Sequence, residues 1–282
     1  MKSYFRTLTI AGSDSGGGAG IQADMKTFSA LGCFGMSVVT ALTAQNTKSV
    51  NSIFPVPPEF IGEQMDAVME DIGVDAVKIG MLHSAEVIAL VADKLNQWNC
   101  PNIVLDPVMV SKSAHRLLKD DAVEALKTLL IPKADIITPN LPEASVLLDQ
   151  KVETLEDMPS AAKALSHLGC STILLKGGHL MDREICDVLY SSNNDSLLQL
   201  PKRRVDTPNS HGTGCTLSSA VCAFLARQLP METAVKKAED YIAHALAAGA
   251  EYRIGHGHGP VHHFHALWPG RKALTGNYGH SR

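Results

Sequence analysis

The sequence has no C-x-x-C pair, no run of about 18 apolar residues and no excess of positive charge, and each absence excludes a class of protein. Its six cysteines, at positions 33, 100, 170, 186, 215 and 222, lack the spacing of a zinc site and are typical of reduced core residues. No segment is apolar for long enough to span a membrane, and the first residues lack the apolar region of a signal peptide. We therefore expect a cytoplasmic protein that does not associate with membranes.

The charge balance argues against nucleic acid as a partner. Lysine and arginine number 25 against 29 aspartate and glutamate residues, a formal net charge of -4 that leaves no basic footprint for a phosphate backbone. A chain of 282 residues with 45% hydrophobic content can bury a large core. Because no repeat, low-complexity stretch or linker interrupts it, we predict one domain over residues 1–268 and a polar tail over 269–282.

Short apolar segments alternate with helical patterns along the whole chain. Strands are predicted at 5–11, 35–42, 49–56, 76–79, 103–105, 136–138 and 172–176, with an edge strand at 185–190. Helices are predicted at 20–31, 57–70, 85–98, 121–130, from 142 onward, and at 160–168, 214–227 and 231–253. Apolar strands separated by helices predict an α/β fold, with a mostly parallel sheet covered on both faces. Ligands of such sheets bind outside the carboxyl ends of the strands.

The segment His211-Gly-Thr-Gly-Cys215 ends a loop and opens a helix. Gly212 and Gly214 allow tight turns and close approach of a ligand. The amides from Gly212 to Cys215, including that of Thr213, would point outward at the positive end of the helix dipole, which favours an anion. Because the same field lowers a thiol pKa, Cys215 is a candidate base or nucleophile. The alternative is a glycine-rich helix start with a buried cysteine.

A second glycine-rich loop, residues 12–20, follows the first predicted strand and opens a helix. It lacks the Lys-Ser/Thr ending of a Walker phosphate loop and matches a dinucleotide fingerprint only loosely. For Asp24, in the helix that follows, the position alone predicts a solvent-facing carboxylate that interacts with the helix dipole. Gln45, just past the second strand, offers an amide donor and acceptor to a heterocycle, or is simply a turn residue.

Four later strand ends also carry polar groups. They supply the segment 78–81, the carboxylate of Asp106, the pair Asn140 and Glu143 at spacing three, and the cation Lys176. Two carboxylates, an asparagine, a lysine and an anion-binding helix start suit Mg²⁺-assisted phosphoryl transfer, where positioning and charge neutralisation dominate catalysis. Each residue alone could be a helix cap or a surface ion pair, but their convergence on one sheet edge favours a site.

These motifs together resemble those of the hydroxymethylpyrimidine/phosphomethylpyrimidine kinases of thiamine biosynthesis, within the ribokinase-like superfamily. The matching segments, which run from the first strand to the last helices, are 11–24, 40–46, 78–81, 106–108, 138–143, 175–178 and 211–215. The resemblance implies an αβα sandwich with a central, mostly parallel sheet, commonly a homodimer. It also implies ATP-dependent phosphorylation of hydroxymethylpyrimidine, its monophosphate or both.

The resemblance further implies a role for each matching residue. A pocket for the pyrimidine ring would be formed by Gly12, Asp24, Gln45, Met81 and Val108. Mg²⁺ would be held directly or through water by Asp106 and Glu143, and ATP would be contacted by Lys176 and Asn140.

The same resemblance assigns the helix start to the chemical step. Gly212, Thr213 and Gly214 would form the anion hole, and Cys215 would be the base that deprotonates the substrate hydroxyl. The wider superfamily usually has aspartate at this position, whereas this subgroup has cysteine.

Two other functions stay open on the sequence. A kinase of the same fold acting on pyridoxal or pyridoxine would bind a similar ring with a hydroxymethyl group. A non-enzymatic nucleotide or cofactor sensor could share the scaffold, although it would not need the candidate base. The histidine-rich segment 255–265 is read from the resemblance as a loop near the nucleotide, with adventitious metal binding as the alternative.

Overall fold

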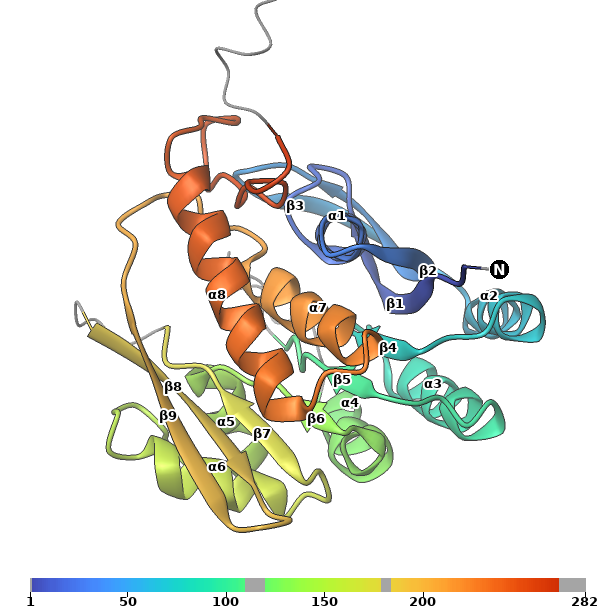
Figure 1. The fold of residues 1–282 in the computed structure, drawn as a ribbon. Helices are drawn as coiled ribbons and strands as arrows, with labels where there is room; N and C mark the ends of the chain where they lie inside the picture. The colour runs from blue at the N-terminus through green and yellow to red at the C-terminus, as the bar shows by residue number, and fades with distance from the viewer. Residues whose placement is uncertain (1, 110–119, 179–183, 269–282) are drawn as a thin grey trace, which may run out of the picture.

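The computed structural model describes residues 2–109, 120–178 and 184–268, which form one nine-stranded sheet with the order β3-β2-β1-β4-β5-β6-β7-β8-β9 (Figure 1). The strands are β1 (Phe5–Asp14), β2 (Cys33–Gln45), β3 (Val50–Pro55), β4 (Ala76–Ile79), β5 (Ile103–Leu105), β6 (Ile136–Ile137), β7 (Thr172–Leu175), β8 (Glu184–Ser191) and β9 (Ser196–Arg203). Neighbours from β2 to β7 pair in parallel, whereas β3, β8 and β9 join antiparallel. The predicted tail over 269–282 lies outside the described residues.

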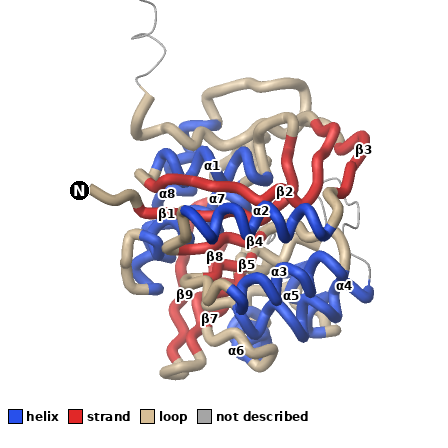
Figure 2. The backbone as a smooth tube through the Cα atoms, turned by 90° about the vertical axis from the view of Figure 1, so that its right-hand side faces the viewer, coloured by secondary structure: helices blue, strands red, loops and turns tan. Residues whose placement is uncertain are grey.

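Helices cover both faces of the sheet and complete an αβα sandwich, as predicted (Figure 2). The helices are α1 (Gly20–Ala30), α2 (Pro58–Asp71), α3 (Ala85–Gln97), α4 (Asp120–Ala125), α5 (Leu141–Leu148), α6 (Met158–Ser166), α7 (Thr213–Ala226) and α8 (Met231–Gly249). One face buries Phe28 of α1, Val221 of α7 and Ile242 of α8. The opposite face buries α2 to α6 through residues such as Ile61 and Ile88.

The prediction of an edge strand at 185–190 was wrong. The corresponding strand β8 pairs with β7 on one side and with β9 on the other, so β9 forms the edge. Strand β9 was not predicted from the sequence, because alternate residues are exposed and Pro201 interrupts an otherwise weak apolar pattern. Proline is tolerated there because the outer side of an edge strand needs no ladder hydrogen bond.

The helix predicted over 121–130 is also different in the structure. Regular α-helix ends at Ala125 and is followed by a π-helical turn, Leu126–Leu130, and a 3₁₀ turn, Ile131–Lys133. Pro132 has no N–H and cannot continue α-helical hydrogen bonding, so the chain turns there toward β6.

The connections after the adjacent strands β1 and β4 lead to opposite faces of the sheet, and this determines where the site lies. The chain leaving β1 enters α1, which packs on the α7 and α8 side of the sheet. The chain leaving the adjacent strand β4 enters α3, on the opposite side. Parallel sheets leave a crevice at such a point, outside the carboxyl ends of the strands.

The cysteines and the helices can be compared with the expectations from composition. All six cysteines are free thiols. Within residues 2–109, 120–178 and 184–268, no helix combines the length and apolar character needed to cross a membrane.

Candidate active site

A cavity of about 700 Å³ opens at the carboxyl ends of the parallel strands. Its walls come from the loops after β1, β4, β5, β6 and β7, from the β2–β3 ribbon, and from the start of α7. Of the residues predicted from the sequence, those that line the cavity are Gly12, Gln45, Met81, Asp106, Val108, Asn140, Glu143, Lys176, Gly212, Thr213, Gly214 and Cys215. Residues far apart in the chain therefore meet at one edge, as expected.

Asp24 is the exception, since it does not line the cavity but lies fully buried beneath it. Its carboxylate forms an ion pair of 2.9 Å with the buried Lys78 Nζ and accepts hydrogen bonds from Thr9 at 2.6 Å and Ser219 at 2.7 Å. The solvent-facing interpretation was therefore wrong. Burial opposes the charge of Lys78, but the negative groups around it, Asp24 foremost, raise its pKa. Lys78 itself reaches the cavity wall.

Lys176 and Asp106 form a second ion pair at the ends of β7 and β5. Lys176 Nζ lies 2.9 Å from Asp106 Oδ1, the Thr138 hydroxyl donates to the same oxygen at 3.2 Å, and Ser218 Oγ lies 3.4 Å from Asp106 Oδ2. Burial alone would raise the pKa of Asp106, but the cations Lys176 and Lys78 outweigh it and hold the pKa below its ordinary value. The cavity thus contains a cation that is already balanced by a buried carboxylate.

Asn140 and Glu143 form a capping box at the start of α5. The Asn140 side chain accepts the Glu143 N–H at 2.9 Å, and the Glu143 carboxylate accepts the Asn140 N–H at 2.8 Å. The interpretation of this pair as a helix cap was therefore right, although both residues also line the cavity. Burial raises the pKa of Glu143 to about 7, with Lys176 opposing the shift and Asp106 adding to it.

The start of α7 has the geometry of an anion site. Gly212 adopts φ +78°, and a Cβ there would overlap the carbonyl oxygen of Gly18, so only glycine fits. No side chain caps the helix, and the Thr213 N–H has only a distant acceptor, the Ser210 carbonyl at 3.5 Å, so the first amides can bind a ligand. A Cβ at Gly214 would stand 3.4 Å from Lys176 Nζ, so a lysine cation lies beside these amides. Helix dipole and cation both favour a negative group here.

The thiol pKa of Cys215 differs from the sequence-based expectation. The position at the helix start predicted a lowered thiol pKa, but burial raises the pKa of Cys215 to about 11. The nearby cation Lys78 and a hydrogen bond from the Gly20 backbone act in the opposite direction, whereas the carboxylates Asp24 and Asp106 add to the shift. Desolvation of the thiolate therefore dominates. The thiol is protonated at neutral pH.

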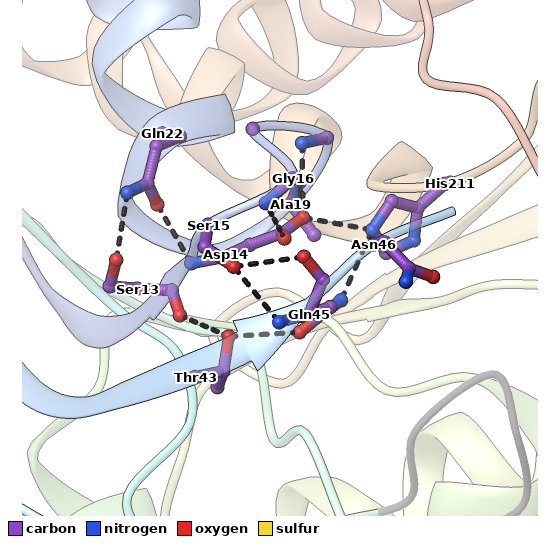
Figure 3. Close-up of polar contacts among 12 residues, drawn as sticks. Ser13, Asp14, Ser15, Gly16, Ala19, Gln22, Thr43, Gln45, Asn46 and His211 are labelled. Atoms are coloured by element: carbon purple, nitrogen blue, oxygen red, sulfur yellow. Dashed lines mark hydrogen bonds and ion pairs between the residues drawn. The ribbon is translucent and has the colours of Figure 1, made fainter. Parts of the chain in front are cut away.

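Two residues without a predicted role, Asp14 and His211, connect the loops around the cavity (Figure 3). Asp14, the last residue of β1, accepts the backbone N–H groups of Gly16, Gly18 and Ala19 at 2.8 Å, 3.0 Å and 2.8 Å. His211 Nε2 lies 2.9 Å from the same carboxylate. Aspartate two residues before glycine is a common turn signal, which the sequence analysis did not use.

The histidine-rich segment packs as a loop against the cavity wall. His211 N–H donates to the Gly259 carbonyl at 3.0 Å, and the His258 N–H donates to the Thr47 carbonyl at 2.9 Å. His263 is buried, and burial lowers its pKa to about 3. In the part of the chain that the structure describes, no three histidine, cysteine or acidic side chains are grouped to hold a metal. The predicted proximity to a nucleotide stays a prediction.

Comparisons with known proteins agree with this geometry. The model of the family described as phosphomethylpyrimidine kinase matches residues 14–262. The hydroxymethylpyrimidine/phosphomethylpyrimidine kinase of Escherichia coli K12 is 46% identical over 93% of this chain and 98% of its own. The solved phosphomethylpyrimidine kinase of Clostridium difficile has a TM-score of 0.75 and 45% identity, covering 86% of this chain and 99% of its own.

A pyridoxal kinase has the same fold. The ADP complex of Bacillus subtilis pyridoxal kinase has a TM-score of 0.86 and 38% identity, covering 93% of this chain and 98% of its own. The family match nevertheless spans most of this chain, and the sequence motifs, the sheet order and the cavity all agree with it. The chain therefore belongs to the phosphomethylpyrimidine kinase family.

Proposed function

We propose that this protein transfers the γ-phosphoryl group of ATP to hydroxymethylpyrimidine and to its monophosphate. The observation that carries the proposal is the convergence in one cavity of Gln45, the Lys176–Asp106 pair, Glu143 and the uncapped start of α7. Relatives that this chain matches over 93% of its length bear the names of both activities. The ADP complex of the B. subtilis neighbour supports ATP as the donor.

The cavity has a separate region for each substrate in this proposal. Gly12, Gln45, Met81 and Val108 line the cavity at the ends of β1, β2, β4 and β5, where a flat ring would lie. Lys176 and the first amides of α7 border the part that suits phosphate oxygens. The substrate hydroxyl would attack the γ-phosphorus between these regions as the bond to the β-phosphate oxygen breaks and ADP leaves.

The acidic residues fit a magnesium ion that arrives with the nucleotide. Mg²⁺ keeps several waters and takes only one or two protein carboxylates when it also binds phosphates. Asp106 and Glu143 meet that description, because they are two buried carboxylates on the cavity wall and both act on the same cation, raising the pKa of Lys176. These residues would hold the ion directly or through water, and the ion would neutralise charge on the phosphates.

We predict that the Mg²⁺ requirement depends on pH through Glu143. A metal binds the ionised carboxylate, so a pKa of about 7 means that protons compete with Mg²⁺ below neutrality. Apparent Mg²⁺ affinity should rise from about pH 6 to about pH 8, and Glu143→Gln should flatten this dependence and raise the requirement roughly tenfold. Steady-state kinetics at several Mg²⁺ concentrations measures both effects. The exposed Glu153→Gln serves as the control, and an unchanged pH dependence in Glu143→Gln would place the metal elsewhere.

We also predict that Gln45 recognises the ring. Loss of a buried polar partner costs about 1–3 kcal/mol, so Gln45→Ala should raise the KM for the pyrimidine roughly ten- to a hundredfold. The KM for ATP should stay the same, since Gln45 ends β2 and the cation Lys176 follows β7 across the sheet. An unaltered pyrimidine KM would contradict the assignment.

Pyridoxal phosphorylation is the second candidate, favoured by the similarity to B. subtilis pyridoxal kinase. Kinetics on hydroxymethylpyrimidine, its monophosphate and pyridoxal, measured side by side, decides between the two activities. A kcat/KM for pyridoxal above that for both pyrimidines would overturn the proposed function. The sensor hypothesis has no support from the relatives, which are named as kinases.

The proposal includes a homodimer in the cytoplasm. Leu42 and Phe54, which pair on the β2–β3 ribbon, expose 49% and 66% of their surface. Neighbouring exposed apolar side chains of this kind suit a protein interface. The free cysteines support a reducing compartment. Sedimentation equilibrium measures the oligomeric state.

A further inference from the structure

His211 lines the cavity next to the start of α7. It directly precedes Gly212, the residue before α7, and its side chain reaches the ends of β1 and β2 (Figure 3). Nε2 of His211 lies 2.9 Å from Asp14 Oδ2 and 3.3 Å from Nε2 of Gln45. One ring nitrogen therefore faces a carboxylate and an amide nitrogen at the same time.

The carboxylate decides the protonation of that nitrogen. Burial opposes ionisation of Asp14, but the hydrogen bonds from His211 and from the backbone of Ala19 and Gly16 lower its pKa. An ionised carboxylate can only accept hydrogen bonds. Nε2 of His211 must therefore carry a hydrogen and donate it to Asp14.

This arrangement leaves the Gln45 carboxamide without a strong partner in the protein. A protonated Nε2 has no lone pair to offer, so His211 cannot accept from the Gln45 amide. On the other side, Gln45 Oε1 lies 3.3 Å from Thr43 Oγ1, but the single hydroxyl hydrogen of Thr43 has a nearer acceptor in the Ser13 carbonyl at 2.7 Å. The donor and the acceptor of the carboxamide are both available to a ligand in the cavity that Gln45 lines.

We infer that His211 is a positioning residue for ring recognition. Because its N–H donates to the Asp14 carboxylate, the Gln45 carboxamide stays available for a ligand. The matching ligand has a ring edge with one acceptor and one donor, such as the ring nitrogen and amino group of an aminopyrimidine. Without the His211 N–H, the carboxylate becomes the strongest acceptor beside Gln45 and captures its amide. This inference rests on the proposed function, because it names the ring edge that is read.

The experiment compares His211→Leu, which removes the N–H, with His211→Gln, which keeps one. Each is assayed on hydroxymethylpyrimidine and on the analogue that lacks the amino group. The wild type should prefer the amino compound in kcat/KM by roughly ten- to a hundredfold. In His211→Leu this ratio should fall toward one through KM, with the KM for ATP unchanged. His211→Gln should restore most of the ratio.

A second variant tests the same logic through the other partner. Asp14→Asn removes the carboxylate that requires a hydrogen on His211 Nε2. This nitrogen can then accept a hydrogen bond from the Gln45 amide, which is no longer available to the ligand. The selectivity ratio should fall here as well. His258→Leu is the control, because His258 is an exposed histidine whose Nδ1 lies 3.4 Å from the Pro208 carbonyl.

The possible outcomes separate the inference from the proposed function. A wild-type ratio in folded His211→Leu and Asp14→Asn overturns the inference. An equal loss on both substrates also overturns it, since His211 would then only maintain the structure of the loops. If the wild type phosphorylates neither pyrimidine, the proposed function fails instead. Thermal unfolding of each variant shows whether it is folded.

Discussion

Replacing Cys215 with serine is expected to lower kcat by about 10²-fold, the low end of the 10²–10⁴ that a positioned general base contributes. The low end is expected because burial raises the thiol pKa to about 11, so only a small fraction is ionised at neutral pH. A serine hydroxyl in the same place is far less acidic. The KM values for both substrates should change little, because the amides of Gly212 to Gly214 remain.

The pH dependence of kcat tests the role of Cys215 as general base more directly. The thiolate fraction rises about tenfold for each pH unit below the pKa, so kcat of the wild type should increase from pH 7 into the alkaline range. Cys215→Asp should retain more activity than Cys215→Ser and lose this alkaline rise, since a carboxylate is already ionised. Near-normal kcat in Cys215→Ser would exclude the thiol as the base and leave the helix start with anion binding alone.

Replacing Lys78 with methionine is expected to lower the free energy of unfolding by about 3–5 kcal/mol, the usual effect of removing one partner of a buried ion pair. Lys78 and Asp24 are both fully buried and their charged atoms lie 2.9 Å apart. Methionine fills similar volume, so the loss comes from the uncompensated Asp24 carboxylate, which keeps its hydrogen bonds from Thr9 and Ser219 but loses its cation.

Urea unfolding of three variants separates charge from packing. The double variant Lys78→Met with Asp24→Asn should recover part of the stability, because no unpaired charge is then buried. Lys163→Met breaks the exposed pair with Asp195 and should change stability by no more than about 1 kcal/mol. A loss below about 1 kcal/mol in Lys78→Met would show that water or another cation reaches Asp24.

The order of strands and helices and the place of the site were predictable from the sequence. Apolar segments between helical patterns indicated a parallel sheet, and the structure confirms the αβα sandwich. Residues that directly follow parallel strands, such as Asp106 and Lys176, must lie on one edge, whatever their separation in the chain. This is why polar residues next to predicted strand ends, such as Asp106 and Lys176, could be assigned to the cavity wall from the sequence.

Edge strands and helix caps inside a site are features that the local sequence pattern does not predict. The strand β9 is half exposed and contains Pro201, so its local pattern is too weak to predict. The Asn140–Glu143 spacing indicates a cap and a metal ligand equally well, and only the fold shows that the cap forms inside the cavity. The raised pKa of Glu143 follows from burial, which spacing does not reveal.

What the sequence by itself determined is therefore the fold class, the edge of the sheet that holds the site, and several of the polar groups that meet there. Only the tertiary structure decided how those groups are paired and charged. Asp24 is buried because Lys78, 54 residues away, neutralises it, and His211 bonds Asp14 across 197 residues. Cys215 is held protonated by its desolvation. Local patterns record which side chains are present, but pKa and hydrogen-bond direction depend on solvent exclusion and on partners that only folding brings within a few ångströms.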